Sequence, residues 1–164
     1  MYQVKDAMSH KVVSIRPETT VDAAIRVLLD NGVSGAPVID DTGKLCGVIS
    51  QFQLLEVLYD PQVRNCRVAE LMTRNVLTVE DTTLLGVAAS QFVIHRIRRL
   101  PVVQGGRVIG ILSRSDLLRY FIKTGENLES FFAKLKGTTH AAATSVLPPA
   151  TCGATPTQTA GSLR

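Results

Sequence analysis

The sequence has no tryptophan, and only 5% of its residues are aromatic, too few for the stacking surface that single-stranded nucleic acids favour. It has no apolar run near the ~18 residues that a membrane-spanning helix needs. Its first residues carry no apolar signal-peptide core. Its three cysteines, Cys46, Cys66 and Cys152, form no CxxC pair, which favours free thiols over a disulfide framework or a zinc site. We therefore expect a cytoplasmic globular protein that does not enter a membrane.

The charge is distributed unevenly along the chain. The net charge is +4, from 18 basic and 14 acidic residues. Residues 1–60 hold 5 basic and 8 acidic side chains, whereas residues 61–136 hold 12 basic and 6 acidic ones. A basic second half indicates an anionic partner, although a solvated basic face would give the same counts.

The chain contains an internal repeat. It is found at an offset of 64 residues and continues at an offset of 63 after a gap of one residue. Because chance does not keep one register over so many motifs, we infer a duplication, with repeats at residues 1–60 and 61–124. The aligned segments are residues 6–9 with 70–73, 12–15 with 76–79, 36–39 with 100–103, and 43–50 with 106–113.

Each repeat predicts the order strand, helix, strand, strand, helix. In the first copy Thr19 or Thr20 supplies a hydroxyl cap for the first helix. The two later strands form a hairpin around residues 40–43 in one copy and 104–106 in the other. The predicted first strands are residues 12–15 and 76–79. In the first copy the apolar positions are Val21, Ala24, Ile25, Leu28 and Leu29 in the first helix and Leu54, Leu55 and Leu58 in the last helix. In the second copy they are Leu85, Ala88, Ala89, Phe92 and Val93 in the first helix and Leu117, Leu118, Phe121 and Ile122 in the last helix.

A unit of about 60 residues buries only a marginal core by itself. We therefore expect the two repeats to pack sheet to sheet around one shared core, with pseudo-twofold symmetry. Small ligands usually bind at such junctions, so the clefts between the repeats are the expected sites.

The chain after the second repeat divides into two parts. Residues 126–136 have the spacing of a short amphipathic helix, which either caps the module or contacts a partner chain, and we place the C-terminal helix at residues 125–136. Residues 137–164 are rich in Ala, Thr, Pro and Gly with almost no charge, which predicts a disordered tail.

The motifs that occur twice in the same order resemble a tandem pair of cystathionine-β-synthase (CBS) domains, over about residues 4–123. The resemblance implies a mixed α+β or α/β fold in which two β-α-β-β-α repeats form one disc-like module with pseudo-twofold symmetry, called a Bateman module. It also implies two clefts that often bind adenosine nucleotides, association into a flat homodimer, and a regulatory role without catalysis. The expected ligand is AMP, ADP, ATP or S-adenosylmethionine, and no catalytic cofactor is expected.

The ligand motif of that family, Gly, apolar, x, Ser or Thr, x, x, Asp, is complete at residues 110–116. The resemblance implies that Asp116 accepts hydrogen bonds from the ribose hydroxyls of the ligand. An ionised carboxylate suits this role because it can accept two hydrogen bonds at once. Ser113 with Asp116 is also the pattern of an ordinary helix cap, and the two roles are compatible. The apolar residues of the cleft would enclose the adenine, with core packing as the alternative, and Lys11 and Arg114 can reach phosphates. The residues carried over to this first cleft are Met8, Lys11, Val13, Val33, Ser34, Ile111, Ser113, Arg114, Ser115 and Asp116.

The other copy of the motif, at residues 47–53, has Gln53 in the place of Asp116. A neutral amide binds a hydroxyl without charge assistance, and Phe52 is bulkier than Ser115, which disfavours ribose there. The run at residues 95–99 carries three arginines whose guanidinium groups suit phosphate oxygens, with a solvated basic surface as the alternative. This second cleft is expected to take phosphates, a polyphosphate tail or nothing. Its predicted residues are Ser50, Gln53, Leu77, Ile97, Arg98 and Arg99.

The sequence offers no catalytic set. His10, His95 and His140 are too scattered for a metal site, and neither a nucleophilic triad nor a phosphate-binding P-loop is present. The leading hypothesis is a module that senses an adenosine-containing nucleotide in the cleft between the repeats and acts on an unidentified partner protein. The alternative, which Gln53 supports, is a constitutive dimerisation or interaction protein with empty clefts. Nucleic-acid binding through the arginines of residues 96–99 is disfavoured, because the patch is small and lacks aromatic platforms.

Overall fold

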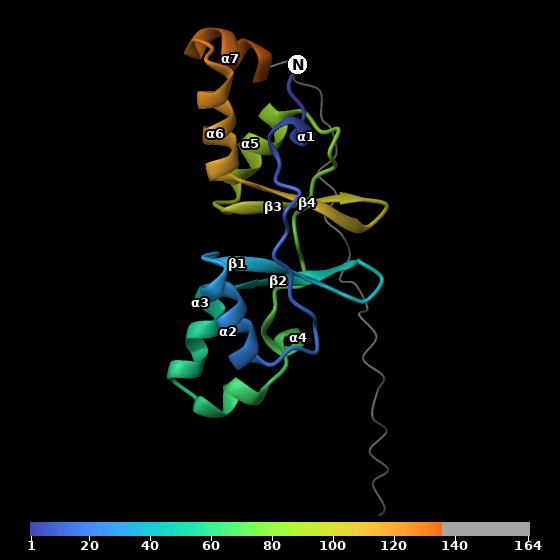
Figure 1. Cartoon of the computed structure of the whole chain (residues 1–164), viewed down its shortest axis with the longest axis vertical. Coiled ribbons are helices and arrows are strands. Elements are labelled where there is room, and N and C mark those ends of the chain that lie inside the picture. The colour runs from blue at the N-terminus through green and yellow to red at the C-terminus, as the bar shows by residue number, and fades with distance from the viewer. Residues whose placement is uncertain (136–164) are drawn as a thin grey trace, which may run out of the picture.

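The structure is a computed structural model that describes residues 1–135 of the 164. Two β-hairpins lie face to face in the middle of the molecule, and helices cover the outer side of each (Figure 1). Residues 1–60 contain α1 (Val4–Ala7), α2 (Val21–Asp30), β1 (Gly35–Ile39), β2 (Leu45–Ser50), α3 (Gln51–Leu54) and the 3-10 helix η1 (Leu55–Leu58). Residues 61–124 contain the 3-10 helix η2 (Pro61–Asn65), α4 (Val68–Leu71), α5 (Leu85–Ile94), β3 (Arg99–Gln104), β4 (Arg107–Ser113) and α6 (Arg114–Thr124), and α7 (Leu128–Leu135) follows the second repeat.

Helix α2 forms where the apolar periodicity predicts a helix. Its N-cap is Thr20, whose hydroxyl accepts a hydrogen bond from the Ala23 amide at 3.3 Å, as expected for a Thr cap. The side chains of Val21, Ala24 and Leu28 are buried against the hairpin. The equivalent helix of the second repeat, α5, has no side-chain cap.

Both predicted hairpins are confirmed. Strand β1 pairs antiparallel with β2, and β3 pairs antiparallel with β4. The first turn is held by Asp40, whose carboxylate accepts hydrogen bonds from the backbone amides of Thr42 and Lys44, each at 2.9 Å. Gly43 and Gly106 close the two turns with φ values of 86° and 79°, which glycine adopts without steric cost.

The prediction of a first strand at residues 12–15 and 76–79 is wrong. Only Ile15 and Val79 form bridges there, one residue each, parallel to β1 and β3. The cause is a crossing of the chain: Ser9 pairs with β4, in the sheet of the second repeat, and six residues later Ile15 pairs with β1. A segment that passes from one sheet to the other cannot pair along either of them.

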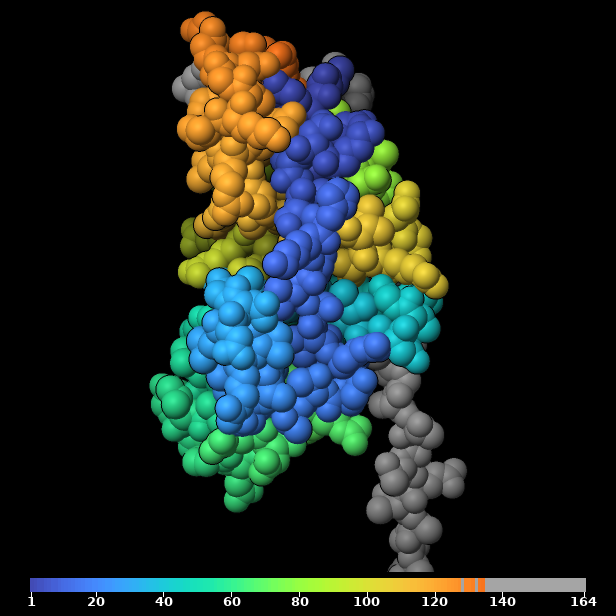
Figure 2. Space-filling view, viewed as in Figure 1, coloured from blue at the N-terminus to red at the C-terminus, as the bar shows by residue number. Residues whose placement is uncertain are grey.

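The leading segments of the two repeats are exchanged. Helix α1 packs with the second repeat, where the Val4 amide donates to the carbonyl of Thr83 at 2.8 Å. Helix α4 packs with the first repeat, where the Val68 amide donates to the carbonyl of Thr19 at 2.8 Å. Figure 2 shows the N-terminal segment, in blue, running along the molecule across both halves. This exchange ties the two halves together and brings residues 9–15 to the junction between them.

The prediction of one shared core is also wrong. The buried side chains form one cluster in each half, with a third, smaller cluster of Leu45, Val76 and Val103 where the sheets meet. Helices cover the outer face of each hairpin, so most burial occurs between helix and sheet. The inner faces of the sheets are only partly filled, which leaves room for clefts.

The predicted last helix of the first repeat is short and irregular. Helix α3 has one turn and continues as the 3-10 helix η1, and of its predicted stripe only Leu54 is buried. In α6 the predicted stripe is also partly exposed, because Leu118 and Ile122 face solvent. No described element covers these residues, so the helical side of the molecule keeps an apolar surface.

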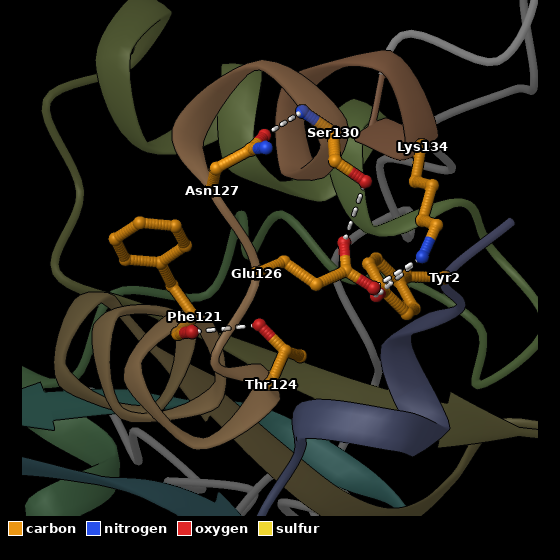
Figure 3. A network of polar contacts seen from close by, with 7 residues as sticks. All are labelled: Tyr2, Phe121, Thr124, Glu126, Asn127, Ser130 and Lys134. Atoms are coloured by element: carbon orange, nitrogen blue, oxygen red, sulfur yellow. Dashed lines mark hydrogen bonds and ion pairs between the residues drawn. The ribbon is translucent and has the colours of Figure 1, made fainter.

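Helix α7 caps the second half, one of the two roles predicted for it. Phe131 is buried, with its ring 5.6 Å from that of Tyr2 and 4.7 Å from that of Phe121. Glu126 accepts a hydrogen bond from the Tyr2 hydroxyl at 2.6 Å and pairs with Lys134 (Figure 3). The predicted disordered tail at residues 137–164 lies outside the described residues.

Candidate functional site

The first predicted cleft exists at the junction of the two halves. It has a volume of about 650 Å³ and is lined from both repeats. Its lining includes nine of the ten residues that the sequence placed there: Lys11, Val13, Val33, Ser34, Ile111, Ser113, Arg114, Ser115 and Asp116.

Met8 is the exception. It lines the neighbouring groove between α1 and α6, which also contains Ser115 and Asp116. Its sulfur packs against Gly110, where an added Cβ would lie only 2.9 Å away. The core-packing alternative therefore describes Met8 better than a place in the first cleft.

Asp116 is positioned by the first turn of α6. One carboxylate oxygen, Oδ2, accepts hydrogen bonds from the Ser113 amide at 2.9 Å and the Ser113 hydroxyl at 2.5 Å. In return the Asp116 amide donates to the Ser113 hydroxyl at 3.1 Å, which completes a capping box. The predicted cap is therefore present, and it fixes the side chain at the edge of the cleft.

The second carboxylate oxygen of Asp116 is held by a weaker interaction within the protein. Oδ1 accepts a hydrogen bond at 2.8 Å from Arg119, whose side chain is 76% exposed, whereas that of Asp116 is 14% exposed. An ion pair with such an exposed partner contributes little and is easily exchanged. Oδ1 is thus the carboxylate oxygen that the protein holds less firmly. Arg119 is not among the residues predicted for the cleft, although its i, i+3 spacing from Asp116 is a recognisable signal.

The contacts of Arg114 differ from the phosphate-binding role predicted for it. Its guanidinium group donates to the carbonyl of Ile97 at 2.8 Å and to that of Phe92 at 3.2 Å. These bonds hold the last turn of α5 and the loop after it against the start of α6, so Arg114 has a structural role. Lys11 is exposed at the mouth of the cleft and stays available to an anion.

The first cleft carries an excess of positive charge. Asp116 is the one carboxylate among its lining residues. The basic side chains that line it are Lys11, Arg98, Arg99, Arg114 and Arg119. This balance favours an anionic ligand that also offers hydroxyl donors to a carboxylate.

Arg99 lies in the wall between the two clefts and lines both. Its guanidinium group donates to the Ser34 hydroxyl at 2.6 Å and to the carbonyl of Gly35, so it joins the second repeat to the first. Burial lowers the pKa of Arg99 and the neighbouring Arg98 adds to the effect, although an arginine stays protonated at neutral pH. Arg99 is consequently less available to a ligand than predicted.

The second predicted cleft is also present, with a volume of about 820 Å³. Thr73, Asn75 and Arg96 line it too, and the site prediction did not include them. All six predicted residues line it: Ser50, Gln53, Leu77, Ile97, Arg98 and Arg99.

Gln53 has every hydrogen-bonding group of its amide occupied. Its Oε1 accepts from the amide and the hydroxyl of Ser50, each at 3.0 Å, in a capping box like that of α6. Its Nε2 donates to the carbonyl of Leu71 and the hydroxyl of Thr73, each also at 3.0 Å. A carboxylate cannot make the last two bonds, because it has no donor. The amide therefore ties α3 to the segment after α4 and has no group left for a sugar.

Arg96 has an unusual backbone conformation. Its φ is 52°, and it is the one described residue other than glycine with a positive φ. The aligned position of the first repeat is Gly32, with a φ of 61°, just after the C-cap of α2 as Arg96 follows that of α5. Glycine is the usual residue there, and a side chain in this conformation costs about 1–2 kcal/mol.

The comparison with known protein families supports the sequence interpretation. The model of the CBS domain matches twice, at residues 4–60 and 68–123. The chain belongs to the CBS-domain family. The exchanged leading segments and facing hairpins described above are thus the arrangement of two CBS domains in this chain.

Several CBS-domain proteins are similar to the chain. A CBS domain-containing protein of Dictyostelium discoideum is 33% identical over 135 residues, which cover 75% of this chain and 93% of that protein. CBSX2 of Arabidopsis thaliana, solved in complex with AMP, is 35% identical with a TM-score of 0.71, over 77% of this chain and 100% of that one. The CBS pair of MJ0100, in complex with 5′-methylthioadenosine and S-adenosyl-L-methionine, is 26% identical with a TM-score of 0.67. The match covers 76% of this chain and 98% of that one.

The share of the relatives that the chain covers varies widely. It spans 41% of the length of one archaeal relative, 64% of a plant relative and 93% of the Dictyostelium protein. Among residues 1–135, no helix is long and apolar enough to cross a bilayer. Cys46 and Cys66 form no disulfide with each other.

Proposed function

We propose that the protein is a regulatory CBS pair that binds an adenosine-containing nucleotide in the first cleft and acts on a partner protein. The observation that carries the proposal is the geometry of Asp116, one oxygen of which anchors the helix while the other stays within reach of a ligand. The similar proteins CBSX2 and MJ0100 bind AMP and S-adenosyl-L-methionine, respectively, and support the ligand class. A cytoplasmic location stays a prediction, since CBSX2 is named chloroplastic.

The ligand is held by complementary groups along the cleft. The ribose hydroxyls donate to Oδ1 of Asp116 and displace Arg119, which is then free to pair with a phosphate. The adenine lies between the apolar side chains of Val13, Val33 and Ile111. The phosphates lie toward Lys11 at the mouth of the cleft.

The charge of the cleft favours AMP, ADP or ATP over S-adenosylmethionine. The nucleotides bring phosphates to a cleft where basic side chains outnumber the one carboxylate. S-adenosylmethionine brings a sulfonium cation to the same surroundings, which is unfavourable. Among the predicted ligands, the phosphorylated nucleotides are therefore expected to bind more tightly.

The protein is expected to form a homodimer through its helical side. The exposed apolar side chains there occur at matched positions of the two repeats, and two such bands related by symmetry can cover each other. A Leu118→Asp substitution should convert the dimer to a monomer in sedimentation velocity, and a wild-type chain that is monomeric at high concentration would contradict the proposal. The matched pairs are Leu29 with Val93, Leu55 with Leu118, and Tyr59 with Ile122.

A constitutive interaction protein with empty clefts is the second candidate function. The exposed apolar band and the occupied amide of Gln53 favour it. It differs from the first candidate in one respect that can be measured, because its stability would not respond to any nucleotide.

Thermal unfolding with AMP, ADP, ATP, S-adenosylmethionine, NAD and a cyclic dinucleotide separates the two candidates. A ligand at 100 times its dissociation constant stabilises the folded state by about 2.7 kcal/mol. For a chain of this size the melting temperature should rise by roughly 5–10 °C. The rise should be largest for a phosphorylated adenine nucleotide.

The response should depend on the carboxylate in the first cleft. Asp116→Ala and Asp116→Asn should abolish the shift, and Asn retains an acceptor for Ser113 if loss of the cap destabilises the Ala variant. Asp30→Ala removes an exposed acid outside both clefts and should respond as the wild type does. No shift with any of the six ligands would favour the interaction protein.

A further inference from the structure

The two ends of the molecule are covered to different extents. Helix α7 packs on the outer end of the second half, where the ring of Phe131 lies 4.7 Å from that of Phe121 and 5.6 Å from that of Tyr2. Figure 1 shows the 3-10 helices η1 and η2, in green shades, at the opposite end of the molecule. The internal repeat matches Phe121 with Leu58 and Tyr2 with Cys66. The first half therefore has counterparts of the two positions on which a helix packs in the second half.

The first half has only a short segment in the place of α7. The 3-10 helix η2 packs against α2, as α7 packs against α5. It has five residues where α7 has eight, and its Val63 is half-buried against the core. Leu58 keeps 73% of its surface exposed, whereas its counterpart Phe121 is half-buried beneath α7. The end of the first half thus keeps an apolar side chain that its counterpart buries under a helix.

Leu58 lies outside the apolar band that we assign to the homodimer. That band consists of matched side chains that are exposed in both repeats, such as Leu55 with Leu118. The counterpart of Leu58 is covered within the chain, so the surface around Leu58 is present in one half only. It is therefore a separate surface, and the packing of α7 in the other half indicates that a helix fits it.

The surroundings of Leu58 are acidic. Residues 51–60 include Glu56 and Asp60, both exposed, and no basic residue. The Asp60 amide donates to the Glu56 carbonyl at 3.1 Å, which places the two acids one turn apart on either side of Leu58 in the sequence. A symmetric contact between two copies through this surface would bring these acids together, which is unfavourable, whereas a basic partner is attracted to them.

We propose that the surface formed by Glu56, Leu58 and Asp60, which we call the η1 face, binds a basic amphipathic helix of a partner protein. An apolar side chain of that helix packs on Leu58 as Phe131 packs on Phe121. Its lysine or arginine side chains pair with the two acids. The inference rests on the proposed function in one respect, that the chain acts on a partner protein, and it does not depend on nucleotide binding.

The probe is a synthetic peptide of residues 126–136 that carries Glu126→Lys and Glu129→Lys. It keeps Phe131, and the two substitutions make it strongly basic. The wild-type chain should bind the labelled peptide in fluorescence anisotropy. The unmodified peptide should bind more weakly, because its acids meet those of the η1 face. Leu58→Ser should weaken binding of the basic peptide about tenfold or more, since it removes the apolar contact.

Two further variants separate charge from apolar contact. Glu56→Lys should weaken binding of the basic peptide about two- to fivefold, because an exposed charge contributes less than a buried apolar contact. Leu118→Ser is the matched control, since Leu118 is 64% exposed on α6 in the other half, and it should bind within about twofold of the wild type. Because Leu58 and Glu56 are exposed, their substitution should leave the melting temperature nearly unchanged.

Three results would overturn the proposal. The first is no binding of the basic peptide at about 1 mM, and the second is equal affinity of the wild type, Leu58→Ser and Glu56→Lys. The third is a dimer that Leu58→Ser converts to a monomer in sedimentation velocity, which would mean that a second copy covers the η1 face. A chain that binds the peptide but shows no thermal shift with any nucleotide supports the η1 face and counts only against the nucleotide site.

Discussion

The side chains at the matched ends of the two ligand motifs differ in length and in charge, because Gln53 has one more methylene than Asp116 and an amide nitrogen in place of a carboxylate oxygen. Asp116 and Gln53 both close a capping box with the serine three residues before them. The other carboxylate oxygen of Asp116 then accepts a hydrogen bond from the exposed Arg119, while the amide nitrogen of Gln53 donates to Leu71 and Thr73. The same local structure therefore gives one position that can recognise a hydroxyl and one that links α3 to α4.

Gln53→Ala tests this difference through stability. The substitution removes the hydrogen bonds of the amide and leaves the partly buried carbonyl of Leu71 without this donor. The free energy of unfolding should fall by about 1–3 kcal/mol in urea denaturation. Gln104→Ala, at an exposed strand end, should change it by less than about 0.5 kcal/mol. Equal effects of the two substitutions would show that Gln53 is not a structural link.

At the scale of elements, local patterns predicted the long helices and the hairpins but not the segments that connect them. The apolar stripe of α2, its Thr20 cap and the glycine turns are all local signals. The four-residue helices α1 and α4 were not predicted, because a single turn has no apolar period to detect. The exchange of Val4 and Val68 between the halves depends on contacts far apart in the sequence.

The attachment of α7 should depend on pH. The hydrogen bond from Lys134, then that from Tyr2, lowers the pKa of Glu126, and the same contact with Glu126 raises the pKa of Lys134. A carboxyl group whose pKa is lower in the folded state than in the unfolded state stabilises the folded state at pH values above the unfolded-state pKa of about 4.3. This contribution is lost as the pH falls through the folded-state pKa. A lysine whose pKa is raised in the folded state contributes its full stabilisation at pH values below the unfolded-state pKa of about 10.4. This contribution is lost as the pH rises through the folded-state pKa.

Hydrogen exchange of the α7 amides measures this attachment. Protection should be constant around neutral pH and should fall in acid below about pH 4.3. Glu126→Gln should lower the protection at neutral pH and remove the acid step, whereas Glu129→Gln, at an exposed site of the same helix, should leave both unchanged. Protection that stays constant to pH 3 in the wild type would contradict the role assigned to Glu126.

For the molecule as a whole, the sequence predicted two clefts, and all of the predicted side chains except Met8 line the cleft to which they were assigned. It succeeded because the resemblance to CBS pairs implies which residues of one repeat face the other, and the duplication supplies the matched positions. It gave Arg114 a ligand role although its guanidinium bonds backbone carbonyls, and side-chain bonds of that kind have no sequence signal. It did not single out Arg96, because only the backbone angle distinguishes that arginine from its neighbours.

The central claim is that the carboxylate of Asp116 recognises ribose hydroxyls in the first cleft. The most direct test is a calorimetric double-mutant cycle with AMP and 2′,3′-dideoxy-AMP against the wild type and Asp116→Ala. Hydrogen bonds to a charged group contribute about 1.5–3 kcal/mol, so the wild type should bind AMP roughly 10–100 times more tightly than the dideoxy analogue. Asp116→Ala should bind the two ligands equally and weakly. A wild-type chain that binds AMP and its dideoxy analogue with the same affinity would contradict the account.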